Sequence, residues 1–268
     1  DALIPGGYIM IFPQSETRMF PSHDDLGTDI VFLPGKIIEA GNDPASSLYG
    51  RVDSMNCVMG HSMGGGCAVL AASRSKLIRS LAALAPFDTN PSASESASGV
   101  SVPSLIFSGS NDCITPPEKH QIPIFNNLAG SRKALITISG ANHCQMADRK
   151  FLCKLGESTC RPDASISYEE QHRIILRYLV LWLDYTLKGN NGAGVEFKSA
   201  VRADQWLHLQ GTDQEILFLQ IAFCEYMILY AYVELDIFNN EFGTGSILEH
   251  ILEYDLFREP PPVKVFNI

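Results

Sequence analysis

The pentapeptide Gly60-His-Ser-Met-Gly64 is the feature that most constrains how this chain folds. It follows a short apolar run at residues 55–59 and precedes a stretch rich in glycine and alanine at residues 64–76. Small residues around the central serine allow a sharp, strained turn from a strand into a helix. Such a turn exposes the serine hydroxyl, and the N-terminus of the following helix favours negative charge beside it. The motif therefore predicts that Ser62 is a nucleophile.

Short apolar segments alternate with helical segments along most of the chain. We expect strands at residues 8–13, 55–59, 78–84, 102–108 and 134–138, and helices at 23–40, 64–76, 167–187 and, in part, 116–128. This alternation predicts an α/β protein with a doubly wound, mostly parallel sheet. We expect one catalytic domain over residues 1–210, followed by a C-terminal segment, residues 211–268, to which the sequence assigns no role.

Composition excludes some classes of function. The formal net charge is −10 and no basic run is present, so a nucleic-acid partner is not expected. Residues 216–235 are nearly all apolar, but Glu225 in their middle makes a membrane-spanning helix costly, and we favour a core or partner-facing helix. No two of the seven cysteines are spaced as CxxC, so we expect no metal and no cofactor.

A serine nucleophile needs a base, and the base needs an acid that orients it. His143 follows the expected strand at 134–138, and Asp112 follows the one at 102–108. The carboxyl ends of parallel strands meet at one edge of a sheet, so both residues are expected to reach Ser62. Asp88, after the expected strand at 78–84, is the alternative acid.

The oxyanion of a tetrahedral intermediate needs hydrogen-bond donors, and the N–H of Met63 is expected to supply one. A second donor normally comes from the loop after an earlier strand, which here would precede Asp1. We therefore expect the domain to lack its upstream strands. Only residues 85–101 separate two expected strands, which leaves no room for a lid and predicts an open cleft. Phe87, in this connection, is either an apolar wall for the substrate or ordinary core packing.

Four pieces of the sequence resemble, in this order, the bacterial cutinase and polyester-hydrolase group, which includes poly(ethylene terephthalate) hydrolases, and the wider dienelactone-hydrolase-like set. They are residues 60–66, 84–87, 102–112 with Pro116, and 140–143. The resemblance implies the α/β-hydrolase fold, a triad of Ser62, Asp112 and His143, and Met63 as oxyanion donor. It also implies a secreted carboxylic-ester hydrolase that acts on an ester or polyester. We further expect His61 and Phe87 to contact the substrate.

Four cysteines are candidates for disulfides. Residues 147–167 are expected to form a polar loop that holds Cys153 and Cys160, which suits a local bridge between these two cysteines. Cys113 and Cys144 each follow a residue of the expected triad, so their loops lie side by side if the acid and base are hydrogen-bonded. A bridge between these two loops, which the resemblance also suggests, and two separate thiols are both compatible with the sequence.

Two further functions remain open at this point. One is a lipase-like or platelet-activating-factor-acetylhydrolase-like esterase, which would differ in its preferred acyl length. The other is a catalytically inactive binding protein that keeps the α/β-hydrolase fold. A reactive serine would separate an enzyme from the inactive protein.

Overall fold

The computed structural model describes residues 2–13, 21–147, 151–204 and 207–211. The chain divides into two units, Asp1–Asp213 and Gln214–Ile268, and every described residue belongs to the first. The apolar run at residues 216–235, like the expected C-terminal segment from residue 212 on, lies outside the described residues. Within the described ranges, no helix is long and apolar enough to cross a membrane.

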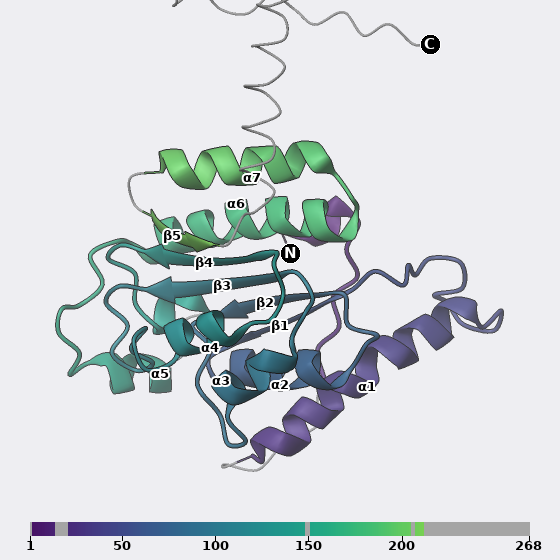
Figure 1. Cartoon of the computed structure of the whole chain (residues 1–268), viewed down its shortest axis with the longest axis horizontal. Helices are drawn as coiled ribbons and strands as arrows, with labels where there is room; N and C mark the ends of the chain where they lie inside the picture. Colours follow the sequence, from purple (N-terminus) through teal and green to yellow (C-terminus); the bar gives the residue numbers. More distant parts are fainter. Residues whose placement is uncertain (1, 14–20, 148–150, 205–206, 212–268) are drawn as a thin grey trace, which may run out of the picture. The chain divides into compact units, whose positions relative to one another are not determined.

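In the described part of the chain, five strands form a single sheet in the order β1-β2-β3-β4-β5 (Figure 1). Their bounds are Cys57–His61, Ser80–Leu84, Ser104–Gly109, Lys133–Ile138 and Leu207–Gly211. The first four are mutually parallel, and β5 is antiparallel to β4. The prediction of a mostly parallel α/β sheet is confirmed. Because all five strands follow one another in chain order, β1 and β5 form the two edges.

Helices cover both faces of the sheet, as the predicted doubly wound architecture requires (Figure 1). One face carries α1 (His23–Asn42), α2 (Met63–Arg74), α3 (Ala93–Ser96) and α4 (Gln121–Asn127), and the other carries α6 (Tyr168–Leu187) and α7 (Asn191–Ala203). The remaining elements are α5 (Phe151–Glu157) and the short 3-10 helices η1 (Ile4–Gly6), η2 (Ala97–Gly99) and η3 (Cys144–Met146).

Strand β3 shows how the sheet supplies two hydrophobic cores. Its side chains alternate between the faces, so Leu105 and Phe107 pack with α6 while Ile106 packs with α2 and α4. All three are completely buried. Burial of each such side chain stabilises the fold by about 1.5–3 kcal/mol. The two cores fix the sheet between its helical layers and so hold the carboxyl ends of the strands in place.

The amphipathic helix α6, which has 20 residues, begins as its sequence predicts. The hydroxyl of Ser167 accepts the backbone N–H of Glu170 at 3.1 Å and caps α6. Along the helix, Ile174, Tyr178 and Trp182 recur every four residues and are buried against the sheet.

The fold differs from the prediction in four places. Residues 8–13 are not a strand; they run as irregular chain, and both they and the edge strand β1 line a pocket. An apolar run of strand-like composition still needs a hydrogen-bonded neighbour to become a strand. The polar stretch expected to be loop at 147–167 contains the helix α5. Helix α7 and strand β5 were not expected either.

The connection between β2 and β3 holds only α3 and η2. These are four and three residues long. All of this connection is described, and it leaves the carboxyl end of β2 without a covering subdomain of its own.

Candidate active site

Ser62 lies between β1 and α2 in a strained backbone conformation. Its φ and ψ are 57° and −123°, values that a residue with a side chain rarely adopts. The turn is tight enough that a Cβ on Gly60 would collide with the backbone of Gly64. Glycine at position 60 is therefore what allows the turn to close and the serine side chain to project from it.

The turn is anchored to the end of strand β2. The N–H of Ser62 donates to the carbonyl of Leu84 at 2.9 Å, and its carbonyl accepts the N–H of Phe87 at the same distance. The carbonyl of Phe87 in turn lies where a Cβ on Gly66 would be. Gly66 thus allows the first turn of α2 to pack directly against the loop that carries Phe87.

His143 lies in the loop after β4 and reaches the serine. Its Nε2 is 2.9 Å from Oγ of Ser62, and its side chain is only 3% exposed. Asp112 lies in the loop after β3, with its carboxylate oxygen Oδ2 2.8 Å from Nδ1 of His143. An ionised carboxylate only accepts, so Nδ1 carries the proton and Nε2 is left to accept the serine hydroxyl.

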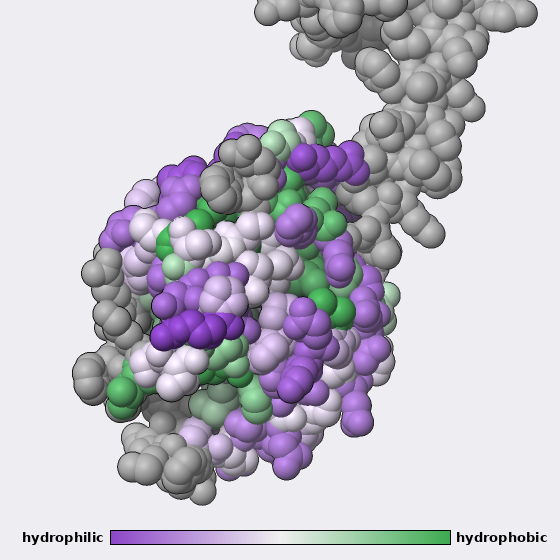
Figure 2. Space-filling view, turned by 90° about the vertical axis from the view of Figure 1, so that its left-hand side faces the viewer, coloured by the Kyte–Doolittle hydropathy of each residue, from purple (hydrophilic) through white to green (hydrophobic). Residues whose placement is uncertain are grey.

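The three side chains meet because their strands are parallel. Ser62 follows β1, Asp112 follows β3 and His143 follows β4, and these strands all end at the same edge of the sheet. This is where ligands of open α/β sheets bind. Figure 2 looks onto this side, where hydrophilic and intermediate residues cover most of the surface and apolar residues show in small patches.

Asp88, the alternative acid, has a different place. Its oxygen Oδ1 accepts the hydroxyl of Ser92 and the backbone N–H of Ser94, both at 2.9 Å. These contacts hold the start of the short helix α3. Asp112, in contrast, is completely buried against His143. The geometry favours Asp112 as the acid.

The backbone N–H of Met63 lies at the start of the helix that follows Ser62. Met63 is the first residue of α2, directly after Ser62, so its N–H has no acceptor within the helix. The first turn of a helix also carries partial positive charge. This N–H is therefore the candidate donor to an oxyanion beside the serine hydroxyl.

His61 contacts the candidate base, His143. Its Nε2 lies 3.1 Å from the carbonyl of His143, and the two rings are 4.6 Å apart. The side chain thus packs on the loop of His143. Its expected contact with a substrate stays a prediction.

Phe87 lies between two histidines that the sequence did not indicate. Its ring centroid is 6.0 Å from that of His23 and 5.0 Å from that of His120. Nδ1 of His120 accepts the N–H of Asp88 at 3.0 Å, and Nδ1 of His23 accepts the N–H of Asn90 at 3.1 Å. Burial lowers the pKa of His120 below its ordinary value. These rings form an aromatic group beside the turn that carries Ser62, which is called the elbow below.

The expected Cys153–Cys160 bridge is wrong, and the Cys113–Cys144 bridge that the sequence left open does not form either. The structure joins Cys113 to Cys160 and Cys144 to Cys153, each with a Cα separation of 5.7 Å. The reason is helix α5, which was expected to be loop: Cys153 lies within it and Cys160 lies beyond its end. Each of the two loops that carry Asp112 and His143 is therefore tied to this segment rather than to the other loop.

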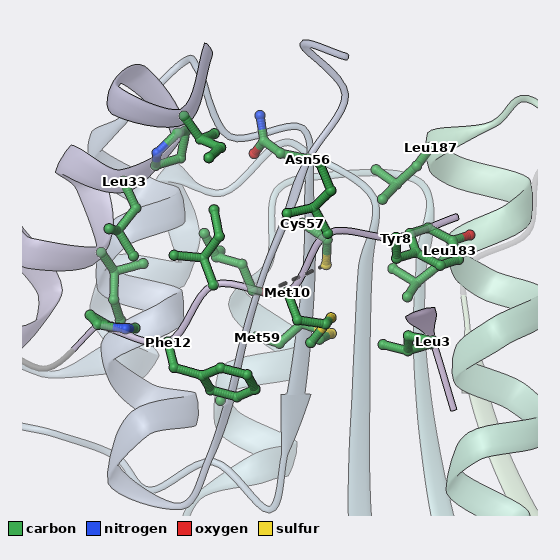
Figure 3. A pocket seen from close by; sticks show the side chains of 18 of the residues that line it. Leu3, Tyr8, Met10, Phe12, Leu33, Asn56, Cys57, Met59, Leu183 and Leu187 are labelled. Atoms are coloured by element: carbon green, nitrogen blue, oxygen red, sulfur yellow. Dashed lines mark hydrogen bonds between the residues drawn. The ribbon is translucent and has the colours of Figure 1, made fainter. Parts of the chain in front are cut away.

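A pocket of about 1000 Å³ runs along the edge strand β1 (Figure 3). Side chains from four regions line the pocket. They are Met10 and Phe12, Leu33 of α1, Cys57 and Met59 of β1, and Leu183 and Leu187 of α6. It reaches the elbow at Gly60 and His61. Burial raises the pKa of the Cys57 thiol to about 12, so this thiol is protonated at neutral pH.

A serine on a strained turn between a parallel strand and a helix, with acid and base following in that order after later strands, defines the α/β-hydrolase fold. Residues 31–157 of the chain match the family described as PET hydrolase-like. This match and the curated relatives below show that the chain is similar to cutinases and PET hydrolases of the α/β-hydrolase fold. The resemblance seen in the sequence is thereby confirmed.

Three curated relatives show how far the similarity extends. Cutinase 2 of Thermobifida cellulosilytica is 38% identical over 104 residues, which make up 38% of this chain and 38% of the relative. Cutinase cut1 of Thermobifida fusca is 38% identical over 104 residues, or 38% of this chain and 31% of the relative. The bis(hydroxyethyl) terephthalate hydrolase of Streptomyces coelicolor is 35% identical over 100 residues, or 37% of this chain and 31% of the relative. The chain thus spans well under half the length of these relatives.

Thr115 and Glu157 are the site residues that sequence reasoning missed. Thr115 hydrogen-bonds both Asp112 and His143, and Glu157 accepts the backbone N–H of His143. A signal existed for Thr115, because Asp often accepts the N–H of a residue a few positions ahead in a turn. No local signal pointed to Glu157, which reaches the site from α5.

Proposed function

We propose that this protein is a serine carboxylic-ester hydrolase of the cutinase or polyesterase type. The observation that carries the proposal is the hydrogen-bonded chain from Ser62 through His143 to the buried Asp112. Such a chain activates a hydroxyl that is otherwise a weak nucleophile. The similarity to proteins named as cutinases and as a terephthalate-ester hydrolase supports an ester as the substrate.

In the proposed reaction, Oγ of Ser62 attacks the ester carbonyl while Nε2 of His143 takes its proton. Asp112 stabilises the imidazolium, and the N–H of Met63 donates to the oxyanion. The bond to the alcohol then breaks as His143 returns the proton to the leaving oxygen, which leaves an acyl group on Ser62. Water repeats the sequence with the same base and releases the acid.

We also propose that the substrate is a long or bulky ester. The short connection between β2 and β3 supports an open cleft, and Phe87 between its two histidines supplies an apolar ring next to the elbow. A polyester chain or an ester of an aromatic acid suits such a surface better than a small ester does.

The test is hydrolysis by the purified full chain of a nitrophenyl ester series with increasing acyl length, together with bis(hydroxyethyl) terephthalate. Substitution of Ser62 by alanine should remove the activity, at a cost of about a millionfold in turnover. Preference for the longest acyl chains without terephthalate cleavage would favour a lipase-like esterase. Activity retained by the pure alanine variant would contradict the mechanism, and a wild-type chain with no activity would favour an inactive binding protein.

An extracellular location is part of the proposal. Two disulfides in a domain of this size support an oxidising compartment. Detection of Cys113–Cys160 and Cys144–Cys153 as free thiols in protein taken from its native source would count against this location.

A further inference from the structure

The side-chain hydroxyl of Thr115 contacts both the candidate acid and the candidate base of the site. Its Oγ1 lies 2.8 Å from Oδ2 of Asp112 and 3.0 Å from Nδ1 of His143. Its backbone N–H donates to the other carboxylate oxygen, Oδ1, at 2.7 Å. The residue is 1% exposed, so no water competes for these contacts from outside. One threonine therefore binds both oxygens of Asp112 and touches the imidazole.

The sequence explains why the hydroxyl reaches this place. Asp112 and Thr115 are three residues apart in a turn, and the carboxylate accepts the threonine N–H as in other Asp-initiated turns. Pro116 follows, and a residue directly before proline disfavours the helical region. The branched Cβ of threonine has few rotamers, which limits the directions that the hydroxyl can take.

The single hydroxyl proton has two acceptors within reach. One is the carboxylate of Asp112 at 2.8 Å, and the other is the carbonyl of Ala85 at 3.3 Å. A shorter bond to a charged acceptor is about twice as strong as a bond to a neutral one, so the proton goes to Asp112. The oxygen lone pairs of Thr115 then face Nδ1 of His143, which suits only an imidazole that carries its proton there.

We propose that Thr115 is a positioning residue for the reaction assigned to this site, on which the inference rests. Its hydroxyl holds the carboxylate of Asp112 in one orientation and selects the tautomer of His143 whose Nε2 accepts the proton of Ser62. It acts through Asp112 and His143 and does not touch the substrate. Thr115 therefore helps in the same way as the acid does, because both fix the tautomer and the ring orientation of the histidine.

Two variants separate this role from packing. Thr115→Val keeps the shape but removes the hydroxyl, while Thr115→Ser keeps the hydroxyl but removes the methyl group. Loss of a hydrogen bond to a charged group corresponds to about a ten- to hundredfold effect. We expect Thr115→Val to lower kcat by about that factor with little change in KM, and Thr115→Ser to remain within a few fold of the wild type.

The second readout is the proton NMR signal of the imidazole Nδ1–H, assigned by its absence in His143→Gln. We expect it to stay in place in Thr115→Ser, and to shift and exchange faster with water in Thr115→Val. This signal needs no turnover. If the wild type hydrolyses no ester, the proposed function fails, and the signal still decides the role of Thr115.

An unchanged signal in folded Thr115→Val would overturn the inference, whatever the activity. So would a loss of kcat that both variants share in proportion to their loss of thermal stability, since this is the pattern of packing alone. If the valine variant does not fold, Thr115→Ser is decisive: a tenfold or greater loss of kcat there would overturn the role of the hydroxyl.

Discussion

The carboxylate of Glu157 accepts the backbone N–H of His143 at 2.8 Å, across 14 positions in the sequence. The same oxygen accepts the N–H of Cys144 at 2.9 Å, and the other oxygen accepts the side-chain amide of Asn142 at 2.8 Å. Glu157 is 8% exposed. The loop that carries the proposed base is therefore held by a buried acceptor at the end of α5.

Substitution of Glu157 by glutamine should disturb this loop. One carboxylate oxygen becomes an amide nitrogen, which either faces the donor amide of Asn142 or the two backbone N–H groups. We expect a loss of about 1–3 kcal/mol in the free energy of unfolding and a decrease in kcat. Urea denaturation and ester hydrolysis measure the two effects. Glu196→Gln, an exposed change on α7, is the control, and equal behaviour of the two variants would contradict the role of Glu157.

The two disulfides should differ in what they contribute to stability. Cys113–Cys160 closes a separation of 47 residues and Cys144–Cys153 one of 9. The chain-entropy model gives roughly 4 kcal/mol for the first and roughly 2.6 kcal/mol for the second. Pairwise replacement by serine, followed by denaturant unfolding, should reproduce this order. A reversed order would contradict the entropic reasoning, and a Cys113–Cys144 peptide in a non-reduced digest would contradict the pairing itself.

Asparagine in place of Asp112 should be far more damaging than asparagine in place of Asp88. The first change favours the wrong tautomer of His143 and is expected to lower kcat by about ten-thousandfold. The second weakens the start of α3, so its main effect should be on stability. Steady-state kinetics on matched, folded proteins compares them. Greater loss of activity from the change at Asp88 would mean that the acid is misassigned.

His120 should make the fold less stable at mildly acidic pH. Its Nδ1 accepts the N–H of Asp88, and burial lowers its pKa below the ordinary 6.5. Between the lowered pKa and 6.5 the unfolded chain binds more protons than the folded one, so stability falls as pH falls through this window. His120→Asn keeps an acceptor but does not titrate. Urea midpoints at pH 7.5 and 5 should therefore differ less in this variant, and an equal difference in both proteins would refute the assignment.

The fold and the three central residues were predictable because their signals are local. An apolar strand, a glycine-rich turn and a small-residue helix are contiguous around Ser62, and parallel strands bring Asp112 and His143 to the same edge. The capping serine of α6 was likewise visible as Ser167-Tyr-Glu-Glu170. Neighbouring residues mark each element, and the parallel sheet then brings the three side chains together.

The remaining features depend on contacts between distant segments. Cys153 and Cys160 are near each other in sequence, but helix α5 directs each to a different loop. Residues 8–13 have the composition of a strand, yet a strand forms only where a neighbour completes its hydrogen bonds. The ring of Phe87 between His23 and His120 joins three segments that share no motif.

Labelling with a fluorophosphonate shows most directly whether Ser62 is a reactive nucleophile. The purified full chain is treated with a fluorophosphonate, digested, and the modified peptide is mapped by mass spectrometry. We predict a single adduct on Ser62, strong slowing of the labelling in His143→Gln, and no adduct at this position in Ser62→Ala. A folded wild-type chain that is not labelled, or one labelled at another serine, would contradict the central claim.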